Sequence, residues 1–104
     1  MTAISVACIR ADAGHRCTVA VGDDRRATRH EVTVSDAVLE RLLPGGTGTV
    51  DAERVVRASF AFLLEREPRE AILRTFDLPV MGRYFPEYEK RIERSLQGEG
   101  PSAP

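Results

Sequence analysis

Residues 4–22 read ISVACIRADAGHRCTVAVG, and in both halves of this stretch larger apolar side chains alternate with small or polar ones. An alternation with a period of two places the larger side chains on one face of a β-strand. The residues Asp-Ala-Gly at positions 12–14 favour a turn, so the stretch predicts an antiparallel hairpin. The side chains on its shared face are Ile4, Val6, Cys8, Cys17, Val19 and Val21.

A third alternating run, from His30 to Val34, follows a second group of turn residues at positions 22–24. The three runs predict a three-stranded antiparallel meander with one apolar face. That face needs cover, and the helices predicted in the rest of the chain can supply it. We therefore expect an α+β fold, in which the N-terminal meander is followed by three to four helices packed on one face. The strands are expected at about residues 3–9, 16–22 and 29–34.

The register of the strands follows from matching their apolar side chains, because a slip by one residue would turn them all to the other face. The same match places the two cysteines opposite each other. The expected cross-strand pairs are Ile4–Val21, Val6–Val19 and Cys8–Cys17 in the first hairpin, and Val19–Val34 and Val21–Val32 in the second.

From Ser35 onward, the apolar side chains recur with the spacing of a helix. Ser35 is a favourable N-cap for the first helix, and Thr49 or Asp51 is expected to cap the second. Pro68 suits the first position of a third helix, and Asp77 is expected to cap a very short fourth turn. The longer helices are expected at about residues 36–43, 50–66, 68–76 and 86–96.

Length and composition indicate one ordinary globular domain. The chain has 104 residues, of which 42% are hydrophobic and 30% charged, with a formal net charge of −1. We expect a single domain over residues 1–97 and a disordered tail over residues 98–104. The near-neutral charge gives no field that would draw the chain to nucleic acid or anionic lipid, so neither is expected as a partner. No stretch approaches the ~20 apolar residues that cross a membrane, and the expected location is the cytoplasm.

The second half of the chain contains three short patterns in succession: FLLEREP at residues 62–68, ILRTFDL at residues 72–78 and YFPEYE at residues 84–89. Together they resemble a pattern in short bacterial proteins of uncharacterised function. The resemblance covers roughly residues 59–89. It implies a small, self-contained protein and assigns no activity to any residue.

Cys8 and Cys17 would be cross-strand neighbours in the expected register, with Cβ atoms roughly 4.5–5.5 Å apart. We expect two buried thiols that act as small hydrophobic residues and stay reduced in the cytoplasm. The alternatives are a redox-switchable disulfide and a zinc site that adds His15 and His30. The spacing contains no CxxC or HxxxH motif, so no metal is expected, and Cys8, His15 and Cys17 are weak candidates only.

Three further patterns favour structural over functional roles. The glycine-rich loop at residues 45–49 joins two predicted helices and lacks the lysine of a phosphate-binding loop. The arginines of residues 25–29 are flanked by acidic residues, which indicates a solvated, salt-bridged face. A helix-turn-helix would need residues 79–84 as its recognition helix, and this segment is too short to read a major groove.

The stretch from Arg74 to Tyr88 contains the candidate site residues. A cleft there would gather Arg74, Asp77, Arg83 and Tyr84 into an anion or carboxylate site, although a network at a helix junction is favoured over it. Exposed Tyr84, Phe85 and Tyr88 beside Arg83 would instead suit the hot spot of a protein interface. The sequence contains no recognisable catalytic arrangement, and no cofactor is expected.

We therefore expect a small, non-catalytic accessory or protein-interaction module that binds a protein partner. Two alternatives stay open: a small anion- or ligand-binding protein or enzyme subunit centred on the first four of these residues, and a redox or metal module at Cys8 and Cys17. A homodimer through the first or last strand of the sheet also stays open.

Overall fold

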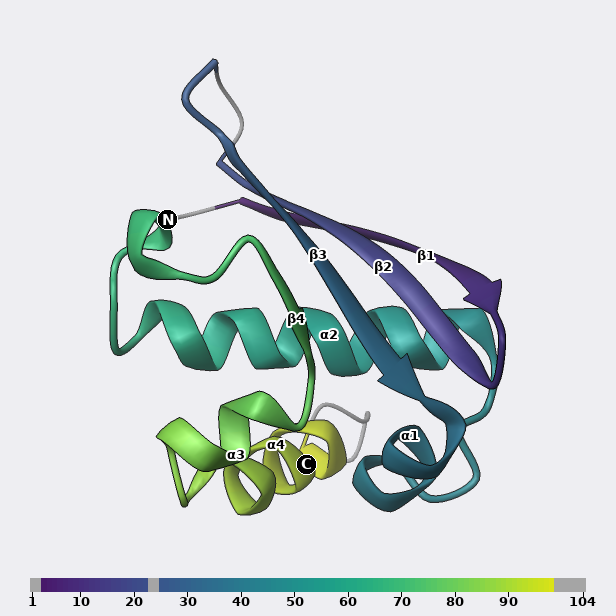
Figure 1. Ribbon diagram of the computed structural model, residues 1–104. Coiled ribbons are helices and arrows are strands. Elements are labelled where there is room, and N and C mark those ends of the chain that lie inside the picture. Colours follow the sequence, from purple (N-terminus) through teal and green to yellow (C-terminus); the bar gives the residue numbers. More distant parts are fainter. Residues whose placement is uncertain (1–2, 23–24, 99–104) are drawn as a thin grey trace.

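The computed structural model describes residues 3–22 and 25–98, and these residues form a four-stranded sheet with helices against one face (Figure 1). The α+β class is as expected, but the sheet contains one strand more than the predicted meander. The elements in chain order are β1 Ile4–Ala11, β2 Gly14–Val21, β3 Thr28–Ser35, α1 Asp36–Leu42, α2 Thr49–Leu64, the 3-10 helix η1 Arg69–Ala71, β4 Thr75–Asp77, α3 Val80–Tyr84 and α4 Tyr88–Gly98.

The first hairpin has the predicted register, because all three expected pairs between β1 and β2 are present. Its turn holds Asp12 in the left-handed region, at a φ of 51°, which Asp tolerates better than most residues. Gly14 follows at a position with no room for a side chain, since a Cβ there would lie 2.3 Å from the carbonyl oxygen of Val34. Asp12 therefore suits the turn of this hairpin, and Gly14 suits the close approach of β3.

The predicted register of the second hairpin is wrong. Val19 lies opposite His30 rather than Val34. Both registers turn the same side chains to the apolar face, so matching apolar residues cannot choose between them. The expected register would place Cys17 opposite Asp36, which belongs to α1 and is not available for pairing. The observed register lets β2 and β3 pair along their whole length.

The helix predicted at residues 68–76 is wrong as well. After η1 the chain becomes extended, and β4 pairs parallel to β3, with Phe76 opposite Val32. The side chains of Ile72, Phe76 and Leu78 are all buried. Ile72 and Phe76, four residues apart, fit one face of a helix as well as one face of a strand, whereas Leu78 shares their face only in an extended segment.

The other helices follow the prediction to within a few residues. The side-chain oxygen of Ser35 accepts a backbone N–H in the first turn of α1, at 3.2 Å, as expected of an N-cap. At the start of α2, the carboxylate of Asp51 accepts the N–H of Gly48 at 3.2 Å. Asp77, expected to cap a helical turn, instead ends β4, and α3 begins after Pro79.

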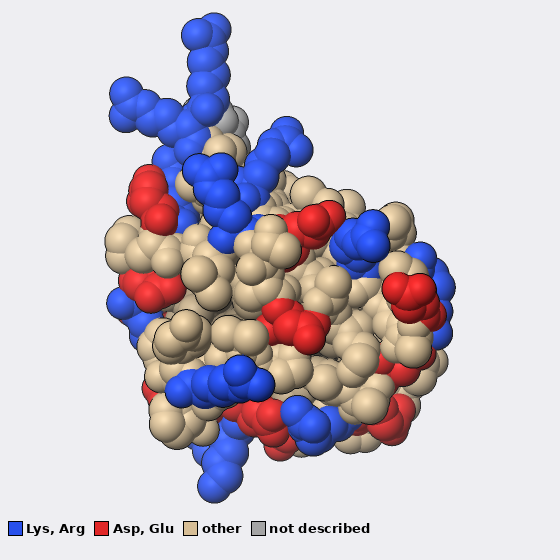
Figure 2. Space-filling model, viewed as in Figure 1, with Lys and Arg blue, Asp and Glu red and all other residues tan. Residues whose placement is uncertain are grey.

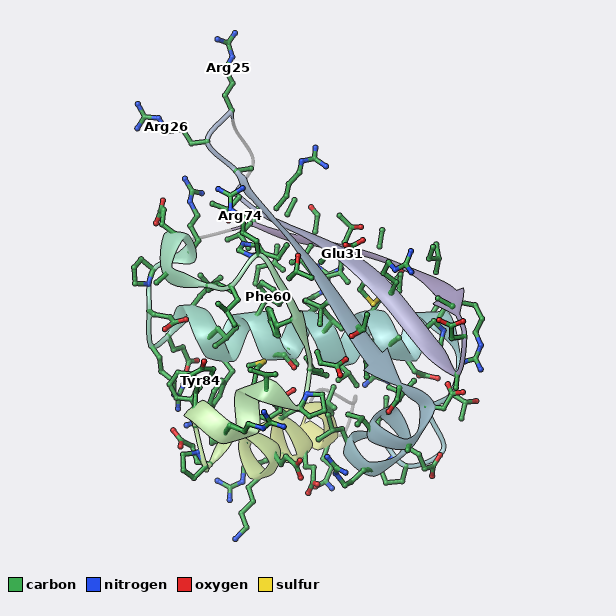
Figure 3. The ribbon with its side chains drawn as sticks, in the orientation of Figure 1. Arg25, Arg26, Glu31, Phe60, Arg74 and Tyr84 are labelled. Carbon is green, nitrogen blue, oxygen red and sulfur yellow. A yellow bond between two sulfur atoms is a disulfide. The ribbon has the colours of Figure 1, made fainter. Side chains whose placement is uncertain are left out.

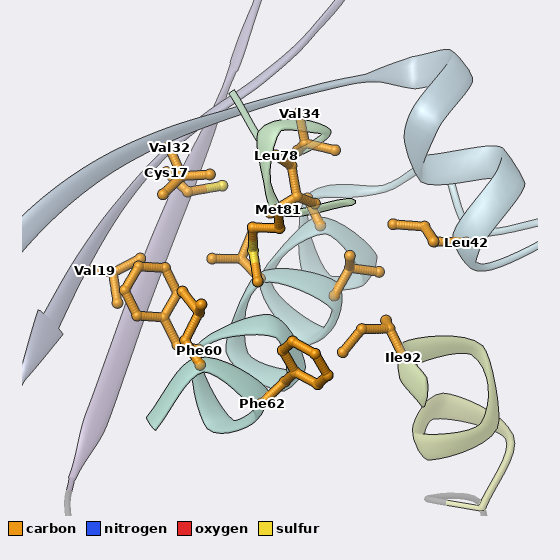
Figure 4. Close-up of a cluster of buried hydrophobic side chains, with 14 of the residues drawn as sticks. Cys17, Val19, Val32, Val34, Leu42, Phe60, Phe62, Leu78, Met81 and Ile92 are labelled. Atoms are coloured by element: carbon orange, nitrogen blue, oxygen red, sulfur yellow. The ribbon is translucent and has the colours of Figure 1, made fainter. Parts of the chain in front are cut away.

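The core lies between the sheet and α2, and it continues to α4 on the far side of that helix (Figure 4). The apolar stripe of α4 is thin, as the sequence predicts, yet it is fully docked. Its side chains Tyr88, Ile92 and Leu96 are all buried. The opposite face of the sheet carries small and polar side chains that are exposed to solvent, among them Ala7, Thr18 and Glu31.

Within residues 3–22 and 25–98, no helix combines the length and the apolar character needed to cross a membrane. Gly98, predicted to begin the disordered tail, is the last residue of α4. The rest of that tail lies outside the described residues.

Candidate functional site

An apolar cleft of about 350 Å³ lies beside β4. The C-terminal end of α2, the segment between η1 and β4, and helix α3 form its walls. The side chains that define it are mainly aliphatic and aromatic, and they include Leu63, Ile72, Leu73, Phe76, Val80 and Tyr84.

The cleft exists because the chain changes direction twice in a short stretch. Pro68 stands just beyond the end of α2, where the preceding residue is steered away from helical geometry. The chain then crosses the end of α2 as η1 and an extended segment, runs through β4, and turns again at Pro79 into α3. These three segments meet without a further element to fill the space between them.

Two large apolar side chains stand on the rim of the cleft and are exposed to solvent. Leu73 has a relative exposure of 49% and Tyr84 of 67%. In Figure 3, Tyr84 projects from α3 at the lower left of the molecule. The other large apolar side chains that are exposed in the described chain, Ile9 and Val50, lie elsewhere, in β1 and in the first turn of α2. Leu73 and Tyr84 are therefore the two of these exposed apolar side chains that share one hollow.

Glu67 is the charged residue among those that line the cleft. Its side chain is half-buried, and it has no hydrogen bond or ion pair within the part of the chain that the structure describes. The neighbouring acidic residues are paired, because Glu65 and Glu87 both contact the guanidinium of Arg66. The cleft thus combines apolar walls with one uncompensated carboxylate.

His30, which lies opposite Val19 in the core, holds one rim of the cleft in place. Its Nδ1 lies 2.8 Å from the carbonyl oxygen of Leu73, and its Nε2 lies 2.9 Å from the hydroxyl of Thr28. Its ring also packs against Phe60, with centroids 5.3 Å apart. The sequence predicts no such role for His30, because it predicts a helix at the position of its partner Leu73.

Of the predicted site residues, Tyr88 belongs to the packing between α2 and α4, whereas Phe85 lines the cleft together with Tyr84 and also packs on α2. Tyr88 is buried, and its hydroxyl lies 2.7 Å from Ser59 Oγ. Burial raises the pKa of the Tyr88 phenol above its ordinary value of 10.0. Phe85 is half-buried and meets the ring of Phe62 edge-on, with centroids 5.6 Å apart. Tyr88 is therefore not part of any surface for a partner.

The four residues of the predicted anion site do not line one cavity. Tyr84 lines the apolar cleft, whereas Asp77 lines a separate depression near the turn between β1 and β2 and accepts a hydrogen bond from the hydroxyl of Thr33. Arg74 precedes β4 and lies near the β2–β3 hairpin (Figure 3), and Arg83 is exposed on α3. The acidic residues near these arginines in the sequence pair with others, Glu70 with Arg69 and Glu87 with Arg66.

Cys8 and Cys17 are joined by a disulfide, so the expected pair of free thiols is wrong. Both residues are buried, with exposures of 7% and 0%. The N–H of Cys8 points to the outside of the sheet and donates to Glu53 Oε2 at 3.0 Å. The two cysteines therefore occupy a non-hydrogen-bonded pair, the position at which antiparallel side chains come closest, and their Cα atoms are 3.9 Å apart.

The described residues contain no group of three or more His, Cys, Asp or Glu side chains placed to hold a metal ion. Of the residues considered for zinc, His15 lies with its Nε2 3.3 Å from the hydroxyl of Thr49, and the cysteines are bonded to each other. The zinc site considered from the sequence is not assembled in this arrangement.

Arginine side chains project at the tip of the β2–β3 hairpin (Figure 2). Arg25 and Arg26 extend from it, and Arg74 lies below them (Figure 3). The neighbouring Asp23 and Asp24 lie outside the described residues, so the charge balance expected for this hairpin stays a prediction.

Comparison of the chain with protein-family models, with curated proteins and with solved structures finds no match. The resemblance of residues 59–89 to short bacterial proteins therefore stays a prediction, and the argument about function rests on the cleft itself.

Proposed function

We propose that this protein is a small interaction module, without catalysis of its own, that binds a protein partner through the apolar cleft beside β4. The observation that carries the proposal is the position of Leu73 and Tyr84, two exposed apolar side chains on the rim of one hollow. Removing such surface from water is the main driving force of protein association, and aromatic anchors dominate its energetics.

The lining of the cleft supports binding rather than chemistry. General acid–base or nucleophilic catalysis needs polar groups within hydrogen-bond reach of one another. Among the described lining residues, Glu67 has no such neighbour, and the remaining walls are mainly aliphatic or aromatic. A volume of this size also admits one or two apolar side chains of a partner.

The compartment in which the protein resides bears on the redox state of Cys8 and Cys17 rather than on the cleft. The cytoplasm, expected from the sequence, would normally keep Cys8 and Cys17 reduced, whereas a disulfide favours an oxidising compartment. The cytoplasmic location stays a prediction. Acid quenching of the cells preserves the redox state of the cysteines. Counting the free thiols of the protein then distinguishes a reducing from an oxidising compartment.

The proposal is tested by capturing partners from extracts of the source organism on the immobilised full chain. Leu73→Ala and Tyr84→Ala remove the apolar rim of the cleft, while Ile9→Ala and Val50→Ala remove equally exposed apolar side chains elsewhere. We expect a partner that the wild type and the two control variants retain and that both cleft variants lose. Retention by the cleft variants, or failure of the wild type to capture any protein, would contradict the proposal.

A further inference from the structure

The two edges of the sheet differ in what covers them. Along β1, the outermost strand on one side, side chains from α2 contact the outward backbone groups: Glu53 accepts the N–H of Cys8, and Arg57 donates to the carbonyl of Ile4 at 2.5 Å. Edge strands are commonly protected in this way against pairing with another chain. The β1 edge is thus capped by the protein's own side chains.

The edge formed by β4 is open. The carbonyl of Arg74 and the N–H of Leu78 bond to β3, so the even-numbered residues of this segment direct their backbone groups inward. Thr75 and Asp77 lie between them and direct their N–H and C=O groups away from β3. Both residues are exposed. The sheet therefore ends in two residues whose backbone donors and acceptors are available to a further strand.

The open edge and the apolar cleft adjoin each other. Phe76, the central residue of β4, lines the cleft, and so does Leu73, which precedes the strand. An extended segment laid along β4 would therefore pass over the cleft. Because side chains alternate along a strand, every second side chain of such a segment would point into it.

The negative charge of Glu67 in the cleft restricts which side chains that segment carries. Glu67 is half-buried and unpaired within the described chain, whereas the rest of the lining has no charged group. A positive charge placed beside it would gain a partner that the protein does not itself supply. A purely apolar occupant would instead leave the carboxylate partly desolvated and unpaired, which is costly.

We propose that the occupant of the cleft is an extended peptide segment of another protein, which adds to the sheet as a strand beside β4. It places one apolar side chain in the cleft and a Lys or Arg, two positions away on the same face, beside Glu67. This inference rests on the proposed function and specifies the partner. Strand addition of this kind takes its affinity from main-chain hydrogen bonds and its specificity from pockets for alternate side chains.

The test uses a library of random 12-residue peptides displayed on phage and selected on the immobilised full chain. We expect the selected peptides to share an apolar residue with a Lys or Arg two positions away. A synthetic peptide of that sequence is then titrated against the chain. N-methylation of the amide that pairs with β4 should weaken binding about threefold to tenfold, because one hydrogen bond is lost. N-methylation of the next amide, which faces away, is the matched control and should leave affinity unchanged.

The role of the carboxylate is measured with Glu67→Gln, and Glu93→Gln on α4 is the control that removes a charge outside the cleft. We expect Glu67→Gln to weaken binding about two- to fivefold, in line with a partly exposed ion pair. Replacing the basic residue of the peptide by Gln should abolish the difference between Glu67→Gln and wild type, as a double-mutant cycle requires. Glu93→Gln should bind like wild type.

The outcomes separate this inference from the function on which it rests. Peptides that depend on Leu73 but tolerate N-methylation at every position, or that lack a basic residue, would overturn strand addition and leave the cleft as a binding site. Binding that Leu73→Ala does not affect would overturn both. The proposal of a peptide partner would be overturned if the library yields no peptide and the chain instead dimerises through the cleft. It would also be overturned if the library yields no peptide and the cleft takes up only a small apolar dye.

Discussion

The buried imidazole of His30 donates a hydrogen bond from Nδ1 to the main-chain carbonyl of Leu73, 2.8 Å away. A carbonyl oxygen only accepts, so Nδ1 carries a proton, and Nε2 on the other side of the ring lies 2.9 Å from the hydroxyl of Thr28. This contact joins β3 to the segment that forms one rim of the cleft. It connects the core of the protein directly to its candidate binding surface.

We therefore expect His30→Leu to affect both stability and binding. The leucine keeps the site apolar but leaves the carbonyl of Leu73 without its partner, which should lower the free energy of unfolding by about 1–3 kcal/mol. Urea denaturation measures this change, and titration with a cleft-binding peptide measures the effect on the rim. Thr28→Val, which removes only the second partner of the ring, should cost less. Equal stability of His30→Leu and wild type would contradict the role given to His30.

The disulfide between Cys8 and Cys17 should stabilise the fold. Their separation in sequence is 9, and closing a loop of this length removes conformational freedom from the unfolded chain worth about 2–3 kcal/mol. Denaturation with and without a reductant should show a loss of this size in the wild type. The variant Cys8→Ser/Cys17→Ser should be insensitive to reductant. Two freely titrating thiols in the native, unreduced protein would rule the bond out.

Removing the side-chain cap of the β1 edge should promote self-association. Glu53→Ala exposes the N–H of Cys8, and loss of this charge-assisted hydrogen bond should also destabilise the protein by about 1–2 kcal/mol. Sedimentation velocity at increasing concentration should reveal dimers or larger species. Glu93→Ala, on α4, removes the same charge without uncovering an edge and should remain like wild type. A Glu53→Ala protein that sediments like wild type at every concentration would show that the cap is dispensable.

Stability should fall in alkaline solution because of Tyr88. Its pKa is raised by burial, so above pH 10.0, its ordinary value, the unfolded chain releases the phenolic proton while the folded chain retains it. The folded state then binds more protons, and the free energy of unfolding decreases as pH rises. Denaturation between pH 9 and pH 11 should show this slope in wild type and in Tyr84→Phe. It should be weaker in Tyr88→Phe, and an unchanged slope there would refute the assignment.

The first hairpin could be predicted in detail from the sequence because its information is local. The alternation of apolar side chains, the turn residues and the facing of Cys8 by Cys17 all lie within residues 4–22. The cap at Ser35 and the long apolar stripe of α2 are equally local, and they lie close to where they were expected. A pattern within one element is sufficient to predict its structure where only one period and one turn fit the residues.

The second hairpin and β4 could not be predicted in the same way. Two registers of β3 satisfy the same parity, and only the start of α1 at Asp36 excludes the expected one. The spacing of Ile72 and Phe76 fits either a helix or a strand. Pairing with β3, which is distant in sequence, makes this segment extended.

The sequence by itself determined the class of the fold, the first hairpin and the approximate position of the central helix. Tertiary structure alone decided the cleft. Leu73 borders it because His30 anchors that segment, and Glu67 lines it without an ion pair in the described chain, whereas Glu87 pairs with Arg66. The contacts of His30 with Leu73 and of Arg66 with Glu87 join residues far apart in sequence, whose proximity depends on how the elements pack. No pattern within a single element encodes such packing, which is why the candidate site differs from the one expected.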